Sequence, residues 1–269
     1  MRNRFAAPIL AVLAGLALSS TALAQDKDSS SSDPYTKLSR DTTTGGPAPQ
    51  HDLSGAWVGP ANGKEGEIPP MTPAGEKMFR LNKPVSKFAA ASNDPIRTCD
   101  PLGIPRNLIF QTRGIEFAQM PEKVVILHQY QAVWRQIWTD GRELPKNVDQ
   151  RGGPDSRFYG FSTGHWDGDT FVVDTVGTED RSWLDSAGHP HSVDAHIQER
   201  YTRVDHNHLV LTVTVDDPKI YTKQFTLGTV DFIWSPDQQT QEQVCVPSQT
   251  AAGLKANAKR LSSANKKAE

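Results

Sequence analysis

The sequence predicts an all-β protein in which about eight to ten antiparallel strands close into a barrel. Three observations support this fold class. Many short segments are rich in Val, Ile, Trp, Tyr, Phe and Thr, as strands are, and each is bounded by Gly, Pro, Asn or Asp, as turns require. No internal repeat of the kind that builds a propeller is apparent. Because closure leaves no exposed strand edge, a barrel is favoured over a sandwich, which stays the alternative.

The strands are expected in this order: 53–59, 107–111, 115–120, 124–130, 133–139, 158–166, 170–176, 193–204, 209–216, 222–234 and 241–246. Asp167-Gly168 separates two of them and predicts a tight hairpin, because such a turn needs a residue that tolerates positive φ. Thr72 followed by Pro73 predicts the N-terminus of a short peripheral helix that runs to about Leu81.

The N-terminus predicts export. Arg2 and Arg4 precede an apolar run over residues 8–18, and the small residues Ala22 and Ala24 suit cleavage by a signal peptidase. The run is too short for a spanning helix of about 20 residues, so no transmembrane anchor is expected after cleavage, with a retained anchor as the alternative. Residues 1–24 are therefore interpreted as a signal peptide, which predicts a periplasmic or secreted protein.

Composition divides the remaining chain into three parts. Residues 25–50 are rich in Ser, Thr, Asp, Gly and Pro and read as a disordered leader. Residues 51–248 hold the expected strands and form the barrel domain. Residues 249–269 are a basic tail, either a frayed helix or disordered, whose lysines are interpreted as a solvated face.

The net charge of the chain bears on its possible partners, and its cysteine content bears on the redox state of its thiols. Cleavage removes Arg2 and Arg4, which leaves 27 basic against 31 acidic residues, a net charge of −4. Such a balance argues against a nucleic-acid partner. The two cysteines, Cys99 and Cys245, are expected to form a disulfide in an oxidising compartment, with two free thiols as the alternative.

Two resemblances accompany this interpretation. The segment Asp52-Leu53-Ser54-Gly55-Ala56-Trp57 resembles the Gly-x-Trp opening of lipocalin-type, or calycin, barrels, in which the tryptophan plugs one end. Over a longer span, the chain resembles a family of uncharacterised secreted bacterial proteins in the stretches IWTDGRELP (137–145), STGHWDGDTFVVDTVG (162–177), HPHSVDAHIQERYTR (189–203) and VTVDDPKIYTKQF (213–225). This resemblance implies no catalytic residue, so candidate sites come from the side chains alone.

The strand expected over residues 193–204 contains the main candidate site residue. Alternate residues share a face of a strand, so Glu199 lies among Val193, Ala195, Ile197 and Tyr201. A carboxylate on an apolar face needs a partner. The same alternation places Arg135 and His128 on the apolar faces of two other expected strands.

Glu199, Arg135 and His128 are therefore candidate catalytic residues facing one interior cavity. Arg135 would hold an anionic or carbonyl group, and Glu199 or His128 would move protons. The alternative is a structural Glu199–Arg135 ion pair beside a hydrogen-bonded histidine.

Further candidate residues lie outside this cluster of three. Trp183, His191 and Tyr201 are candidate ligand-binding residues, although Trp183 in a loop also fits a packing role. No metal site is predicted, because the strand period separates His196 from Glu199 and leaves only the loop pair His189 and His191. The Gly-x-Ser-x-Gly pattern at residues 160–164 is not interpreted as a hydrolase elbow, since a β-branched strand follows it rather than a helix.

The function predicted first is a periplasmic or secreted barrel that binds a small, partly apolar molecule carrying an anionic or carbonyl group, because barrels of this size leave room for one such ligand. The alternative is a metal-independent acid–base enzyme, an isomerase, lyase or hydrolase, that uses the polar cluster in the barrel. A purely structural envelope protein ranks below both. No cofactor is predicted.

Overall fold

A computed structural model describes residues 45–88, 91–109, 114–237, 243–253 and 255. The predicted signal peptide (1–24), most of the predicted leader (25–44) and the basic tail from residue 256 lie outside the described residues. No helix among the described residues is long and apolar enough to span a bilayer.

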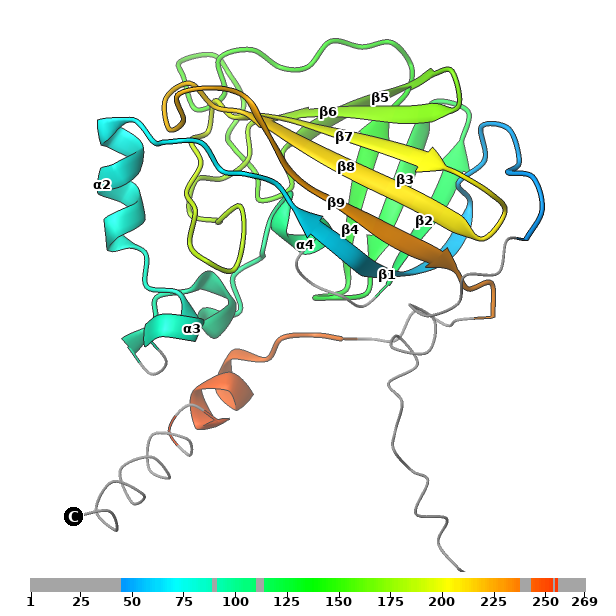
Figure 1. Cartoon of the computed structure of the whole chain (residues 1–269). Coiled ribbons are helices and arrows are strands. Elements are labelled where there is room, and N and C mark those ends of the chain that lie inside the picture. The colour runs from blue at the N-terminus through cyan, green and yellow to red at the C-terminus, as the bar shows by residue number, and fades with distance from the viewer. Residues whose placement is uncertain (1–44, 89–90, 110–113, 238–242, 254, 256–269) are drawn as a thin grey trace, which may run out of the picture. The chain divides into compact units, whose positions relative to one another are not determined.

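Nine strands close into a barrel in sequence order, with β1 pairing both β2 and β9 (Figure 1). Their bounds are β1 (Gly55–Glu65), β2 (Ile115–Met120), β3 (Lys123–His128), β4 (Val133–Trp138), β5 (Phe161–Asp167), β6 (Thr170–Val176), β7 (His196–Arg203), β8 (His208–Asp216) and β9 (Phe225–Trp234). The prediction of a β-barrel is confirmed. The prediction that it is wholly antiparallel is wrong, because β4 and β5 run parallel.

The expected strands 115–120 and 170–176 are reproduced, most other strand ends shift by a few residues, and the Asp167-Gly168 hairpin forms between β5 and β6. Two expected strands are wrong. Residues 106–109 form the short helix α4 (Arg106–Ile109), in which the amide of Asn107 donates to Gly103 O, because a short apolar run suits a buried helical turn as well as a strand. Within 241–246, residues 241 and 242 lie outside the described residues, and Gln243 forms only an isolated bridge with Tyr130.

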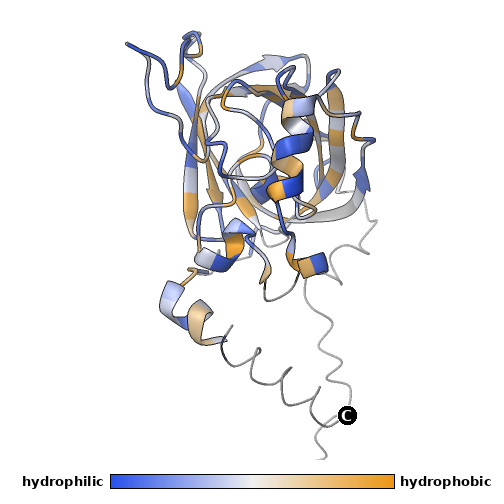
Figure 2. Cartoon of the chain, turned by 90° about the vertical axis from the view of Figure 1, so that its left-hand side faces the viewer, coloured by the Kyte–Doolittle hydropathy of each residue, from blue (hydrophilic) through white to orange (hydrophobic). Residues whose placement is uncertain are grey.

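The predicted helix is confirmed as α2 (Pro73–Leu81), with Thr72 capping it through its hydroxyl, which accepts from Gly75 N. In Figure 2, α2 lies in front of the ring of strands. It packs closely there, because a Cβ on Gly75 would lie 2.5 Å from Ile220 O. The remaining helices are short: α3 (Val85–Phe88), the 3-10 helix η2 (Pro95–Thr98) and an α-helical segment over residues 247–253, which includes the start of the predicted basic tail.

The barrel interior alternates as β-strands require. Inward residues of β7 and β8 are buried and their neighbours are not, so Ile197, Glu199 and Tyr201 face Leu211 and Val213 across the ladder. Trp57 is fully buried, and the Arg203 guanidinium lies 4.8 Å from its ring and 4.9 Å from that of Trp234. The tryptophan of the Gly-x-Trp segment is therefore part of the packed core.

The predicted disulfide between Cys99 and Cys245 is present, and its α-carbons lie 5.4 Å apart. It joins the end of η2 to the segment that follows β9. A second link on this side of the fold is the buried bidentate ion pair of Arg106 with Asp94, at 2.8 and 2.9 Å. Charge pairing and a covalent bond thus anchor the segment between α3 and β2, which lacks strands of its own.

Candidate functional site

Arg135 on β4 and Glu199 on β7 form a buried bidentate ion pair inside the barrel. Arg135 Nη1 lies 2.8 Å from Glu199 Oε2, and Nη2 lies 2.7 Å from Oε1. Their side chains are 2 % and 0 % exposed. Burial opposes the charge of Arg135, but the attraction of Glu199 outweighs it and raises the pKa of the guanidinium. The predicted placement of both residues on inward faces is therefore correct.

Three hydroxyl groups complete this ion pair. Tyr201 Oη donates to Glu199 Oε2 at 2.7 Å, and Arg135 donates to Ser162 Oγ and Thr175 Oγ1 at 2.8 and 2.6 Å. Both carboxylate oxygens and most guanidinium hydrogens are thus engaged. Such a network holds Arg135 in one orientation. Ser162 lies within β5 and accepts a hydrogen bond from Arg135. It is therefore not at the strand-to-helix turn that a hydrolase elbow requires.

His128, at the end of β3, is buried beside this network without being part of it. Its side chain is 2 % exposed, and neither ring nitrogen has a hydrogen-bond partner among the described residues. Burial, and the nearby charge of Arg135, lower the pKa of His128 from 6.5 to about 3. The imidazole is therefore neutral near pH 7, and it is not the hydrogen-bonded histidine of the structural alternative.

A cavity of about 760 Å³ opens where the barrel wall changes from antiparallel to parallel. The pairing of β4 with β5 covers only Ile137 with Ser162 and Trp138 with Thr163. A parallel connection must return along the strands, so residues 139–160 pass back over this seam. Just before β5 begins, the end of this connection lies apart from β4.

Gly160 makes that divergence possible. Its φ is +57°, and a Cβ there would lie 2.7 Å from both Thr175 Cγ2 and Val176 O. Arg157, three residues before Gly160, forms an isolated bridge with Thr178, beyond the end of β6. Residues 157–160 therefore run alongside the end of β6, whereas β4 pairs with β3. The cavity lies between residues 157–160 and β4, and it is called here the seam cavity.

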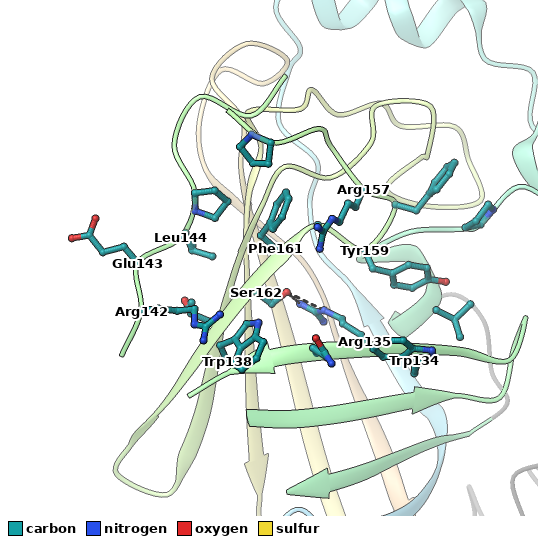
Figure 3. Close-up of a pocket in the computed structure, with 18 residues that line it drawn as sticks. Trp134, Arg135, Trp138, Arg142, Glu143, Leu144, Arg157, Tyr159, Phe161 and Ser162 are labelled. Carbon is teal, nitrogen blue, oxygen red and sulfur yellow. Dashed lines mark hydrogen bonds between the residues drawn. The ribbon is translucent and has the colours of Figure 1, made fainter. Parts of the chain in front are cut away.

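The walls of the seam cavity are mainly apolar, and its charged side chains are three arginines and one glutamate. Its lining comprises Pro101, residues 133–136, Trp138, residues 142–145, Pro154 and residues 157–163. Figure 3 shows Arg157 and Phe161 directed toward the middle of this set, while the carboxylate of Glu143 points away. Arg135 and Ser162, joined by a dashed line, form its polar floor.

Arg157 and Arg142 differ in how their charge is balanced. Arg142 stacks on Trp138, 3.6 Å from the ring centroid, and is paired with Asp140. Arg157 lies 4.3 Å from the ring centroid of Phe161, and no carboxylate pairs with it among the described residues. A guanidinium held against an aromatic face with its donors unused is a good partner for an anion.

The structure separates the predicted site residues. Arg135 lines the seam cavity, Glu199 and Tyr201 lie behind Arg135, and His128 lies against the ring of Tyr159. Trp183 is buried, with the Arg106 guanidinium 5.7 Å from its ring, which fits the packing role. None of the other five predicted residues is part of the described lining.

His191 is fully buried, and Ser182 Oγ lies 2.9 Å from its Nε2. Burial lowers the pKa of His191. His189 instead contacts the carboxylate of Asp185 and stacks on Phe79 at 4.9 Å. No three His, Cys, Asp or Glu side chains gather as metal ligands would in the part of the chain that is described, and the expectation of a metal-free protein stays a prediction.

The sequence interpretation missed Arg157, Trp134, Trp138, Tyr159 and Phe161. A signal was present: the expected strands 133–139 and 158–166 leave a long connection without a strand of its own, and such connections in compact domains are often functional.

Comparison of the chain with protein-family models, with curated protein sequences and with solved structures gave no match.

Proposed function

We propose that this chain is a calycin-like binding barrel, exported to the periplasm or beyond, that holds a small, partly apolar anion in the seam cavity. The observation that carries the proposal is Arg157, an arginine that has no carboxylate partner among the described residues and lies on an aromatic wall of a cavity of about 760 Å³. Ligand sites are typically apolar concavities of this size with a few placed polar groups.

Aromatic side chains favour a flat apolar body for the ligand. Phe161 and Trp138 line the cavity, and each already has a guanidinium against its ring. Trp134 is 61 % exposed, which is unusual for so large an apolar residue unless another surface covers it. A planar ring carrying a carboxylate or a similar anion matches both features.

Binding is favoured over acid–base catalysis by the state of the candidate proton carriers. Glu199 accepts three short hydrogen bonds from Arg135 and Tyr201 and lies behind the cavity floor. His128 has a pKa of about 3, so it does not carry a proton to give near pH 7. The enzyme alternative rests on His128, since its imidazole has no hydrogen-bond partner in the described part of the chain and can accept a hydrogen bond from a ligand.

Export is part of the proposal and rests on the signal peptide read from residues 1–24 and on the Cys99–Cys245 disulfide, which suits an oxidising compartment. The calycin-like assignment is supported by the closed barrel and by the burial of Trp57 beneath Arg203.

An Arg157→Gln variant should bind 2-naphthoate about 10- to 100-fold more weakly than the parent protein, because it loses a charge-assisted hydrogen bond. Titration calorimetry measures the two affinities. Arg181→Gln is the matched control, since Arg181 also stacks on an aromatic ring, Phe158, but is paired with Glu179 and lies outside the cavity lining. Absence of 2-naphthoate binding at millimolar concentration, or equal affinities of parent and Arg157→Gln, would contradict the proposal.

A further inference from the structure

Among the described residues, several buried polar atoms without a hydrogen-bond partner belong to side chains that contact Tyr159 in the wall of the seam cavity. They include both ring nitrogens of His128 and Oδ1 of Asn107, and both side chains are almost completely buried. Folded proteins leave few such atoms unsatisfied, because each costs the loss of its hydrogen bonds to water. A concentration of them at one place therefore indicates that something polar belongs there.

Tyr159 connects these atoms to the cavity. Its ring is 5.8 Å from that of His128, and its hydroxyl oxygen accepts from Asn107 Nδ2 at 2.8 Å. Tyr159 is also part of the cavity lining, on the side from which Arg157 projects (Figure 3). Because the Tyr159 oxygen acts as acceptor toward Asn107, its own O–H is left to donate.

The available donors and acceptors define a chemical class. A neutral His128 offers one donor and one acceptor, Asn107 offers an acceptor, and Tyr159 offers a donor. An anion cannot donate to the acceptors, and a cation would be repelled by Arg135, whose charge already affects His128. An uncharged hydroxyl group both donates and accepts, so it can donate to one of the two acceptors, the His128 nitrogen or Asn107 Oδ1, while it accepts from Tyr159 or from the His128 N–H.

We propose that Tyr159, Asn107 and His128 form a polar subsite of the seam cavity that takes a hydroxyl group of the ligand, so that the ligand is a hydroxylated apolar acid with its anion at Arg157 and its hydroxyl at Tyr159. This inference rests on the proposed function, since it assumes that the seam cavity binds an apolar acid. It adds the requirement for a second, uncharged oxygen.

The test compares 6-hydroxy-2-naphthoate with 2-naphthoate, two acids that differ by one hydroxyl. The parent protein should bind the hydroxylated acid at least 10-fold more tightly, because a site built to hydrogen-bond a hydroxyl discriminates against the analogue that lacks it. In His128→Leu and in Tyr159→Phe this ratio should fall close to one. A ratio of two affinities on the same variant cancels general damage to the fold.

The outcomes separate the two proposals. If neither acid binds, the proposed function fails and the subsite fails with it. If both acids bind through Arg157 with equal affinity, only the subsite is wrong, and ordered water satisfies His128 and Asn107. A preference that survives in both variants also overturns the subsite. Should His128→Leu fail to fold, Tyr159→Phe decides alone, because it removes only one hydroxyl.

Discussion

Glu199→Gln should lower the free energy of unfolding by about 3–5 kcal/mol, the usual cost of removing one partner from a buried ion pair. The substitution keeps the shape of the side chain but leaves the charge of Arg135 uncompensated in the barrel interior, where both side chains are essentially unexposed. It also turns one acceptor toward Arg135 into an amide donor. Urea unfolding followed by circular dichroism measures the change.

Two comparisons show whether burial causes this loss. Asp167→Asn breaks the ion pair with Arg200, whose side chains are 62 % and 39 % exposed, and should have no measurable effect. Combining Arg135→Met with Glu199→Leu removes both charges and should recover much of the stability lost in Glu199→Gln. A Glu199→Gln variant as stable as the parent would mean that Glu199 reaches solvent and that the inner face of β7 is assigned wrongly.

The stability of the parent protein should fall by about 2–3 kcal/mol between pH 6.5 and pH 4.5 because of His128 alone. Burial holds the pKa of His128 at about 3 in the folded protein, against 6.5 when unfolded. A depressed pKa means that the unfolded chain binds the proton first, so the stabilisation is complete above pH 6.5 and is lost as pH falls toward 3. Unfolding curves across this range measure the slope, which His128→Leu should reduce.

His196 provides a control of opposite sign. Its hydrogen bond to Asp174 raises the pKa of its imidazole, so its contribution is complete below pH 6.5 and is lost as pH rises. Replacing His196 by Gln should therefore cost more stability at pH 5 than at pH 8. Equal acid sensitivity of the parent and His128→Leu would show that His128 is hydrated in the folded protein.

Strand periodicity was sufficient to predict that Glu199 and Arg135 both face the barrel interior. Residues 193–204 alternate so regularly that Glu199 had to share a face with Ile197 and Tyr201, and the same rule placed Arg135 inward on β4. The ion pair itself was the structural alternative to a functional cluster, because periodicity assigns the face of each side chain but not the strand that it meets. Local patterns of this kind depend only on the strand itself, and the structure follows them closely.

The seam cavity could not be predicted in the same way. Nothing within residues 133–138 or 161–167 states that these strands run parallel, since parallel and antiparallel strands share the same local pattern. The cavity arises because residues 139–160 must return across that seam. Arg157 lies in this connection, so its importance depends on a long-range arrangement rather than on its neighbours in sequence.

Helix α4 was mispredicted for a related reason. Its apolar residues Leu108 and Ile109 suit a strand by composition, but they are buried in a helical turn that contacts β1 and β9. Asn107, one of the residues of the polar subsite, therefore approaches Tyr159 from a helix rather than from the strand expected there.

A crystal structure of the protein with 2-naphthoate tests most directly whether the seam cavity is the binding site. We expect the naphthalene ring between β4 and residues 157–161, against Phe161, with its carboxylate within hydrogen-bond distance of the Arg157 guanidinium. If 2-naphthoate is bound at another place, such as the barrel end near α2, and the seam cavity beside Arg157 is empty, the seam cavity is not the binding site.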